Sequence, residues 1–91
     1  ANFLFSREGR WFTPPLSSGI LNGIVRALVL EAGLAKVQTL SRTDLDGIES
    51  AILLSSLRIA EPVISIDKVM LREPSEKCHE IHDLLGTFRN R

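Results

Sequence analysis

The segment from Ile24 to Ala32 is the feature that most constrains the fold. It contains no glycine or proline, its only charged residues are Arg26 and Glu31, and it stops at Gly33, a residue favoured just after a helix. This pattern predicts a helix. Because apolar side chains occupy nearly every face of that helix, it should be buried on most sides. A chain of 91 residues can provide that burial only as one small domain or as a piece of a larger one.

Short strand patterns surround this helix. Asn2–Arg7, a turn at Glu8-Gly9 and Arg10–Thr13 predict a hairpin, which the prolines that follow would end. Downstream, the pattern predicts strands over 35–40, 51–54 and 62–66 and a helix start with Thr43 as N-cap. It also predicts a terminal helix from Pro74 to about Phe88. One apolar stripe of this helix carries Ile81, Leu84, Leu85 and Phe88. The order β-β-α-β-α-β-β-α indicates a mixed α/β fold.

Composition and charge argue against several classes of protein. Eleven basic and eleven acidic residues give a formal charge of zero, whereas a nucleic-acid binder of this size would carry a basic excess. The 44% of hydrophobic residues argues against disorder. A single cysteine, Cys78, allows no internal disulfide. Apolar stretches such as Ile24–Leu30 are too short for a membrane span, which needs about 20 residues.

The first residues suggest where the chain works and how much of a protein it represents. Ala1–Arg7 has no basic leader before an apolar core, so we predict no secretory signal and a cytoplasmic location. The strand-like run Phe3-Leu4-Phe5 starts without lead-in residues. We therefore expect a fragment of a longer protein that exposes apolar surface and tends to self-associate.

The loop before the predicted helix is a candidate anion site. Ser17, Ser18, Gly19 and Gly23 leave backbone N–H groups uncovered at a helix N-terminus, where the dipole favours a phosphate. No lysine of the phosphate-loop type follows Gly23, which argues against a nucleotide triphosphatase. The alternative is a plain connection that needs glycine for its turns.

A second candidate site follows the predicted strand 51–54. Ser55 and Ser56 are small hydroxyl residues at the end of a core strand, where open α/β sheets place ligands, and each could donate to a phosphate oxygen. Arg58 could hold a carboxylate through two hydrogen bonds. The alternatives are a strand-end turn and a surface arginine. No Gly-x-Ser-x-Gly elbow surrounds the serines, which argues against a catalytic nucleophile.

The terminal helix carries a weak metal-binding pattern. Cys78 and His82 are spaced i,i+4 and would share a helix face, with His79 and Glu80 between them. Two ligands do not make a metal site, and the only other histidine is His79. We therefore predict no metal site and expect these residues to face solvent.

Three blocks of the sequence form a recognisable set: Asn2-Phe3-Leu4-Phe5 with Gly9–Leu16, Ser18–Arg26, and Ser55-Ser56-Leu57-Arg58 leading to Pro62-Val63. Together they resemble the C-terminal part of the class IV aminotransferase family, the fold-type IV enzymes that use pyridoxal 5′-phosphate (PLP). The resemblance spans residues 2 to about 66 and implies that 1–91 is a C-terminal domain fragment without the N-terminal domain. The implied fold is a mixed β-sheet or pseudo-barrel with helices.

Within the family, the hairpin Glu8-Gly9-Arg10-Trp11 and the run Ser56-Leu57-Arg58 look most like 4-amino-4-deoxychorismate lyases, some of which are fused to aminodeoxychorismate synthase. That resemblance implies formation of 4-aminobenzoate and pyruvate on the folate route. Branched-chain and D-amino-acid aminotransferases, which often have Thr in place of Val25, are the nearest alternatives, and a non-catalytic degenerate domain is a third. The sequence departs from the family pattern at Leu4, Ser55 and Glu61.

The resemblance also assigns roles to residues of this chain. A phosphate cradle is implied at Leu21, Gly23, Ile24 and Val25, with a second phosphate contact at Ser55 and Ser56. Arg58 would lie near the substrate carboxylates, and Asn2 and Thr13 would border the cofactor. The Schiff-base lysine and the glutamate that pairs with the pyridine nitrogen would precede Asn2, so the chain alone should be inactive. A homodimer acting on a small-molecule substrate is expected, with neither nucleic acid nor membrane as partner.

Overall fold

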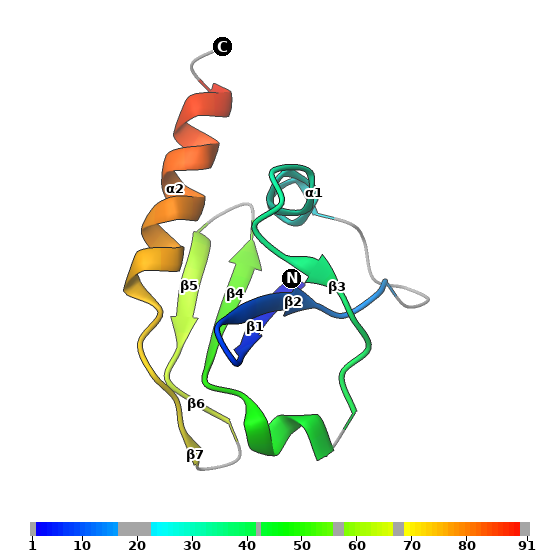
Figure 1. The fold of residues 1–91 in the computed structure, drawn as a ribbon. Helices are drawn as coiled ribbons and strands as arrows, with labels where there is room; N and C mark the ends of the chain where they lie inside the picture. Colours follow the sequence, from blue (N-terminus) through cyan, green and yellow to red (C-terminus); the bar gives the residue numbers. More distant parts are fainter. Residues whose placement is uncertain (1, 17–22, 42, 56–57, 67–68, 90–91) are drawn as a thin grey trace.

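The computed structural model describes residues 2–16, 23–41, 43–55, 58–66 and 69–89 (Figure 1). Both strands and helices occur along this part of the chain. In order they are β1 (Asn2–Arg7), β2 (Arg10–Thr13), α1 (Ile24–Glu31), β3 (Lys36–Val37), the 3-10 helix η1 (Thr43–Gly47), β4 (Ser50–Ser55), β5 (Ile59–Val63), β6 (Ser65–Ile66), β7 (Val69–Met70) and α2 (Ser75–Arg89).

A five-stranded sheet in the order β3-β2-β1-β4-β5 forms the centre of the fold (Figure 1). Its neighbouring strands are antiparallel except for the parallel pair of β2 and β3. β6 and β7 make a separate two-stranded sheet. This mixed sheet with two helices confirms the predicted mixed α/β class.

The turn between β1 and β2 follows the sequence prediction. Glu8 and Gly9 both have positive φ, 54° and 76°. Positive φ at both central residues is the geometry of the two-residue turn that matches the twist of a hairpin. The N–H of Gly9 also donates to Oε1 of Glu49 at 3.1 Å, which joins the turn to the segment before β4.

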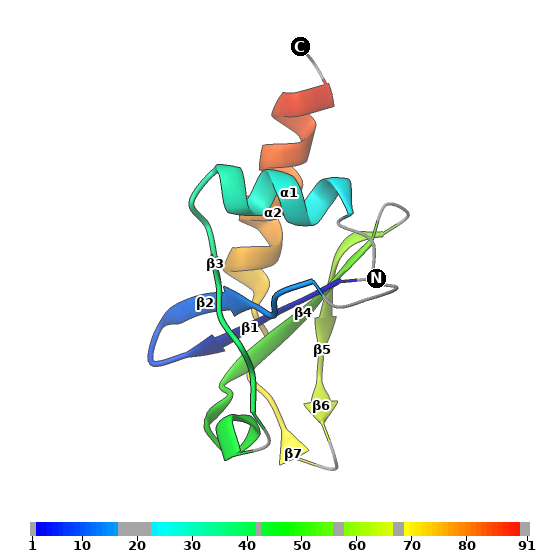
Figure 2. The ribbon, with the colours of Figure 1, turned by 90° about the vertical axis from the view of Figure 1, so that its right-hand side faces the viewer.

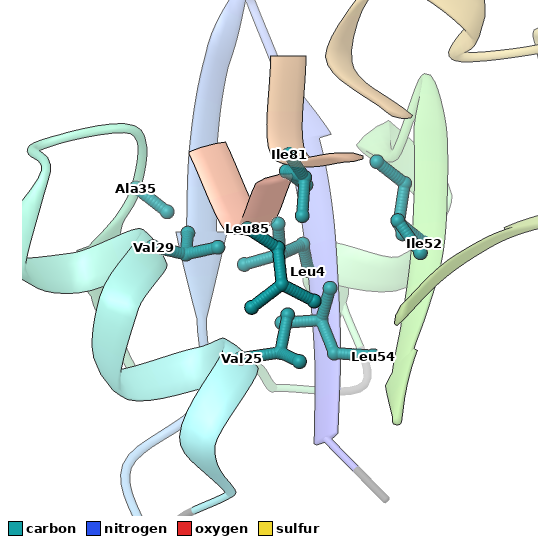
Figure 3. Close-up of a cluster of buried hydrophobic side chains, with 9 residues drawn as sticks. Leu4, Val25, Val29, Ala35, Ile52, Leu54, Ile81 and Leu85 are labelled. Carbon is teal, nitrogen blue, oxygen red and sulfur yellow. The ribbon is translucent and has the colours of Figure 1, made fainter. Parts of the chain in front are cut away.

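Both helices pack on one face of the central sheet, and the core lies between them and the strands (Figure 3). Alternate residues of a strand point to the same face, so residues two apart supply the sheet side of this core. The sheet contributes Leu4, Ile52 and Leu54, α1 contributes Val25 and Val29, and α2 contributes Ile81 and Leu85. The predicted apolar stripe of the terminal helix is thus confirmed at Ile81 and Leu85; the side chain of Phe88 lies outside the described residues.

The strand bounds differ from the predicted ones at the edges of the sheet. The strand expected over 35–40 covers only Lys36–Val37, because the short β2 offers it just the partners Phe12 and Thr13. The strand expected over 62–66 begins earlier, at Ile59, and is interrupted at Ile64 before β6. β7 was not predicted, and the helix expected at Thr43 is a single 3-10 segment.

The prediction that α1 is buried on most sides is only partly correct. Val25 and Val29 are buried, but Ile24 is 64% exposed because only one side of the helix faces the sheet and α2. The charged Arg26, in contrast, is buried. Other large apolar side chains at the surface are Phe3, Leu16, Val37, Ile64 and Met70. Among the described residues, no helix has the length and apolar character to span a membrane.

Candidate functional site

Three segments that are distant in sequence meet at one end of the central sheet. Asn2, the first residue of β1, pairs with Leu54 next to the end of β4. The side-chain Oδ1 of Asn2 accepts a hydrogen bond of 3.2 Å from the N–H of Gly23, just before α1. Figure 2 shows the start of β1, the beginning of α1 and the end of β4 on the same side of the molecule. Gly23 and the end of β4, which belong to the two anion sites predicted from sequence, therefore lie on either side of Asn2.

The N-terminus of α1 lies at this end of the sheet, beside Asn2. Gly23 is the N-cap, and no side chain of the described residues caps the helix. In the first turn of an α-helix, here at Ile24 and Val25, the backbone N–H groups have no carbonyl acceptor four residues earlier within the helix. No acidic residue occupies the first turn, so nothing there opposes a bound anion. The positive end of the helix dipole adds to the attraction.

Gly23 is a glycine because of space, not because of backbone conformation. Its φ of −63° and ψ of 154° are open to any residue. A Cβ at this position, however, would lie 2.8 Å from Oδ1 of Asn2, closer than real Cβ atoms approach a neighbour. The interpretation that the loop needs this glycine for its turns is therefore wrong at Gly23, where close approach of β1 is the reason.

The predicted cradle residues that follow Gly23 contribute through their backbones. The side chain of Ile24 points to solvent, and that of Val25 is 5% exposed and packs in the core (Figure 3). Only their N–H groups can face a ligand at the helix N-terminus. Leu21, also assigned to the cradle, lies outside the described residues.

The end of β4 supplies a hydroxyl group in a constrained turn. The N–H of Arg58 donates to Oγ of Ser55 at 3.1 Å. Ile59, which follows, has a φ of 68°, a strained conformation for a β-branched residue. A hydroxyl that accepts one hydrogen bond keeps its own proton to donate, so Ser55 can serve as a donor to an anion. Ser56 lies outside the described residues.

Arg58 is accessible at the same turn. Its side chain is 69% exposed, and its guanidinium pairs with Glu61 at 3.7 Å. An exposed ion pair of this kind contributes at most about 1 kcal/mol. Arg58 can therefore exchange Glu61 for another carboxylate at little cost in free energy. Glu61 is also the polar residue that departs from the family pattern.

Two buried polar side chains tie the end of β2 to its neighbours. Oγ1 of Thr13, which is 1% exposed, donates to the carbonyl of Phe3 at 2.6 Å. The guanidinium of Arg26 donates to the carbonyl of Pro14 at 3.1 Å. Sequence reasoning placed Thr13 beside the cofactor and gave Arg26 no role. The only available signal for Arg26 was a charge inside an otherwise apolar helix.

Replacing Arg26 with methionine should weaken both the fold and the site. The substitution keeps most of the buried volume but removes a charged donor from the Pro14 carbonyl, which should lower the free energy of unfolding by about 1–3 kcal/mol. Urea denaturation measures this change. The exposed Arg10 is the matched control, and Arg10→Met should shift stability by less than about 0.5 kcal/mol. Equal losses for both variants would show that burial of Arg26 is unimportant.

Cys78 and His82 line a separate hollow between α2 and Pro62 of β5. Its volume is about 270 Å³, and its lining includes Glu73, Cys78, His79 and His82. Burial and the nearby Glu73 carboxylate raise the pKa of the Cys78 thiol, which keeps the thiol protonated. A ring nitrogen of His82 lies 3.3 Å from the carbonyl oxygen of Ala60. The described residues bring together no three side chains that could hold a metal ion.

The family follows from comparison of the sequence with family models. The model of amino-transferase class IV matches residues 1–66, well over half of the chain. The chain belongs to the class IV aminotransferase family. The family expected from the sequence blocks is thereby confirmed. No curated protein matches the sequence.

Solved structures share the fold of the chain at low sequence identity. An aminotransferase from Brucella abortus, bound to the cofactor PLP, is 24% identical with a TM-score of 0.77, over 99% of this chain and 34% of that one. 4-Amino-4-deoxychorismate lyase from Pseudomonas aeruginosa is 22% identical with a TM-score of 0.75, over 92% of this chain and 33% of that one. A branched-chain aminotransferase from Thermoproteus uzoniensis with norvaline is 26% identical with a TM-score of 0.72, over 93% of this chain and 32% of that one. The chain thus spans about a third of the length of these family members.

Proposed function

We propose that this chain supplies the phosphate-binding part of the active site in a PLP-dependent 4-amino-4-deoxychorismate lyase. One observation carries the proposal: the N-terminus of α1 and the end of β4 meet around Asn2. The match to the class IV family supports it, because solved structures of the same fold include a PLP-bound aminotransferase and a lyase of this type. A homodimer in the cytoplasm is part of the proposal.

The residues at this end of the sheet fit the phosphate group of PLP. The N–H groups of Ile24 and Val25 would bind phosphate oxygens, and the hydroxyl of Ser55 would donate from the facing strand end. Gly23 lets the chain run close to β1, with no Cβ in the way. The assignment of Leu21 and Ser56 to the phosphate site rests only on the resemblance of the sequence to the family.

The work of this chain in catalysis would be binding and orientation. When bound, PLP supplies the electron sink that stabilises a carbanion formed on the substrate. The α1 N-terminus would anchor the cofactor by its phosphate and so fix the position of its reactive end. Arg58 would orient a substrate carboxylate by exchanging its pairing with Glu61. The reaction would release 4-aminobenzoate and pyruvate.

An aminotransferase is the second candidate, because a branched-chain aminotransferase shares the fold at 26% identity. We favour the lyase activity for two reasons. The hairpin Glu8-Gly9-Arg10-Trp11 resembles that of the lyases, and Val25 stands where aminotransferases often have Thr. In the structure Val25 packs in the apolar core and offers no hydroxyl to a ligand.

The test uses the intact protein that contains this chain. PLP titration, followed by absorbance, should show saturable binding, and 4-amino-4-deoxychorismate should then yield pyruvate, detected with a coupled dehydrogenase. Amino donors with 2-oxoglutarate should yield no new amino acid. The 91-residue chain alone should not exceed a buffer blank. Amino transfer without pyruvate release would identify an aminotransferase, and a protein that binds no PLP would be a non-catalytic family member.

A further inference from the structure

We propose that Asn2 is a positioning residue that sets the distance between the two halves of the phosphate site. The proposal rests on the proposed function and deepens it. It concerns the alignment of the α1 N-terminus with the end of β4, and it assigns that alignment to a single side chain of the central strand.

Asn2 is buried at a position where an apolar residue would be expected. It is 9% exposed and lies on the same strand face as Leu4, which is fully buried in the core. A polar side chain at such a place is stable only when hydrogen-bonded. Its Oδ1 takes that bond from the N–H of Gly23 at 3.2 Å, across 21 residues of sequence.

Gly23 connects Asn2 directly to the helix. While its N–H donates to Asn2, its carbonyl accepts the first hydrogen bond of α1, from the N–H of Ala27 at 3.0 Å. The same residue is therefore held to the sheet on one side and to the helix on the other. On the sheet, the pairing of Asn2 with Leu54 places the end of β4 next to it. A shift of the Asn2 side chain would move the first-turn donors relative to Ser55.

The fit between the two residues is close enough to make them interdependent. The space that a Cβ of residue 23 would need is occupied by Oδ1 of Asn2, at 2.8 Å. As long as Asn2 is present, Gly23→Ala should therefore shift the Asn2 side chain or the start of α1, and either shift changes how the two are aligned. With Asn2→Ala the conflicting atom is absent, so the added methyl group at position 23 should cost little more.

A double-mutant cycle on the intact protein measures this coupling. Asn2→Ala and Gly23→Ala should each weaken PLP binding at least tenfold, and the double variant should be no weaker than the worse single variant. Ser50→Ala is the matched control. Ser50 is also buried and donates to a backbone carbonyl, that of Arg72 at 3.0 Å, but it lies at the opposite end of β4. This control should lower the thermal midpoint and leave PLP affinity within twofold.

The variant Asn2→Asp distinguishes a role of Asn2 in positioning the phosphate site from a role in fold stability alone. Asn2→Asp keeps an oxygen acceptor for the Gly23 N–H, and a carboxylate near a helix N-terminus favours the helix. The thermal midpoint should stay within a few degrees of the original value. The same carboxylate should repel a phosphate, so PLP affinity should fall at least tenfold. This variant also serves if Asn2→Ala fails to fold.

The outcomes distinguish this proposal from the proposed function. Losses of PLP affinity that multiply in the double variant would overturn the role of Asn2, as would a Ser50→Ala variant as weak as Asn2→Ala. Either result leaves the proposed function standing if the original protein binds PLP. If the original protein binds no PLP, the proposed function fails, and with it the assignment of Asn2 to a phosphate site. Coupling of the thermal midpoints would then show the Asn2–Gly23 contact as structural only.

Discussion

Gly23→Asp is expected to abolish PLP binding by the intact protein, with a loss of affinity of at least about 100-fold, on the order of 3 kcal/mol. Two physical effects add. The new Cβ meets Oδ1 of Asn2 at 2.8 Å, so either the Asn2 side chain or the start of α1 must move. The new carboxylate also occupies the N-cap, where its oxygen accepts the first-turn N–H groups that a phosphate would use. PLP titration by absorbance or fluorescence measures the loss.

Gly86→Asp is the matched control for that charge. Gly86 lies in α2, and a Cβ built there would meet nothing within 4 Å. The substitution introduces the same acidic side chain away from the site, so PLP affinity should be unchanged. A Gly23→Asp variant that still binds PLP as tightly as the original would exclude the α1 N-terminus as the phosphate site, and would favour a non-catalytic role for the chain.

Leu4→Ala should cost more stability than any other substitution considered in this chain. Leu4 is fully buried in the central strand and lies among side chains of β4, α1 and α2. Removing its side chain loses transfer free energy and leaves a cavity, together worth about 2–5 kcal/mol. That loss is a large part of the stability of a typical small domain. Urea unfolding should show a lower midpoint at constant slope.

Ile64→Ala tests whether burial is the cause. Ile64 is an aliphatic residue of the same size class but is 64% exposed. Its truncation should change the free energy of unfolding by less than about 0.5 kcal/mol. Similar losses for the two variants would mean that the core does not lie between the sheet and the helices at Leu4.

Local chemistry allowed the two halves of the candidate site to be recognised from sequence. Gly23 before an apolar helix and Ser55 after an apolar strand are both short-range patterns. Their proximity depends on the pairing of Asn2 with Leu54 and on the Asn2–Gly23 hydrogen bond, which join residues far apart in the chain. No local pattern encodes such a register. Asn2 did carry one signal, because it is a polar residue on the strand face that also holds Leu4.

The failures of sequence reasoning have the same origin. Lys36–Val37 reads as part of a longer strand, but its length is set by β2, the only neighbour it has in the described sheet. The sequence analysis gave Arg26 no role, because the Pro14 carbonyl that accepts its hydrogen bond comes from the segment after β2. In both cases a partner elsewhere in the chain overrides the local preference.

The central place of β1 has a consequence for how the chain acquires its shape. One of the two neighbours of β1 is β4, which begins at Ser50, 43 residues after β1 ends at Arg7. Closing so long a loop is slow compared with forming the β1–β2 hairpin or a helix turn. Until β4 arrives, Asn2 and Leu54 cannot lie side by side, and one edge of β1 remains unpaired. The proposed phosphate site is therefore expected to assemble in the late, long-range stage of folding, after the hairpin and α1 can already exist.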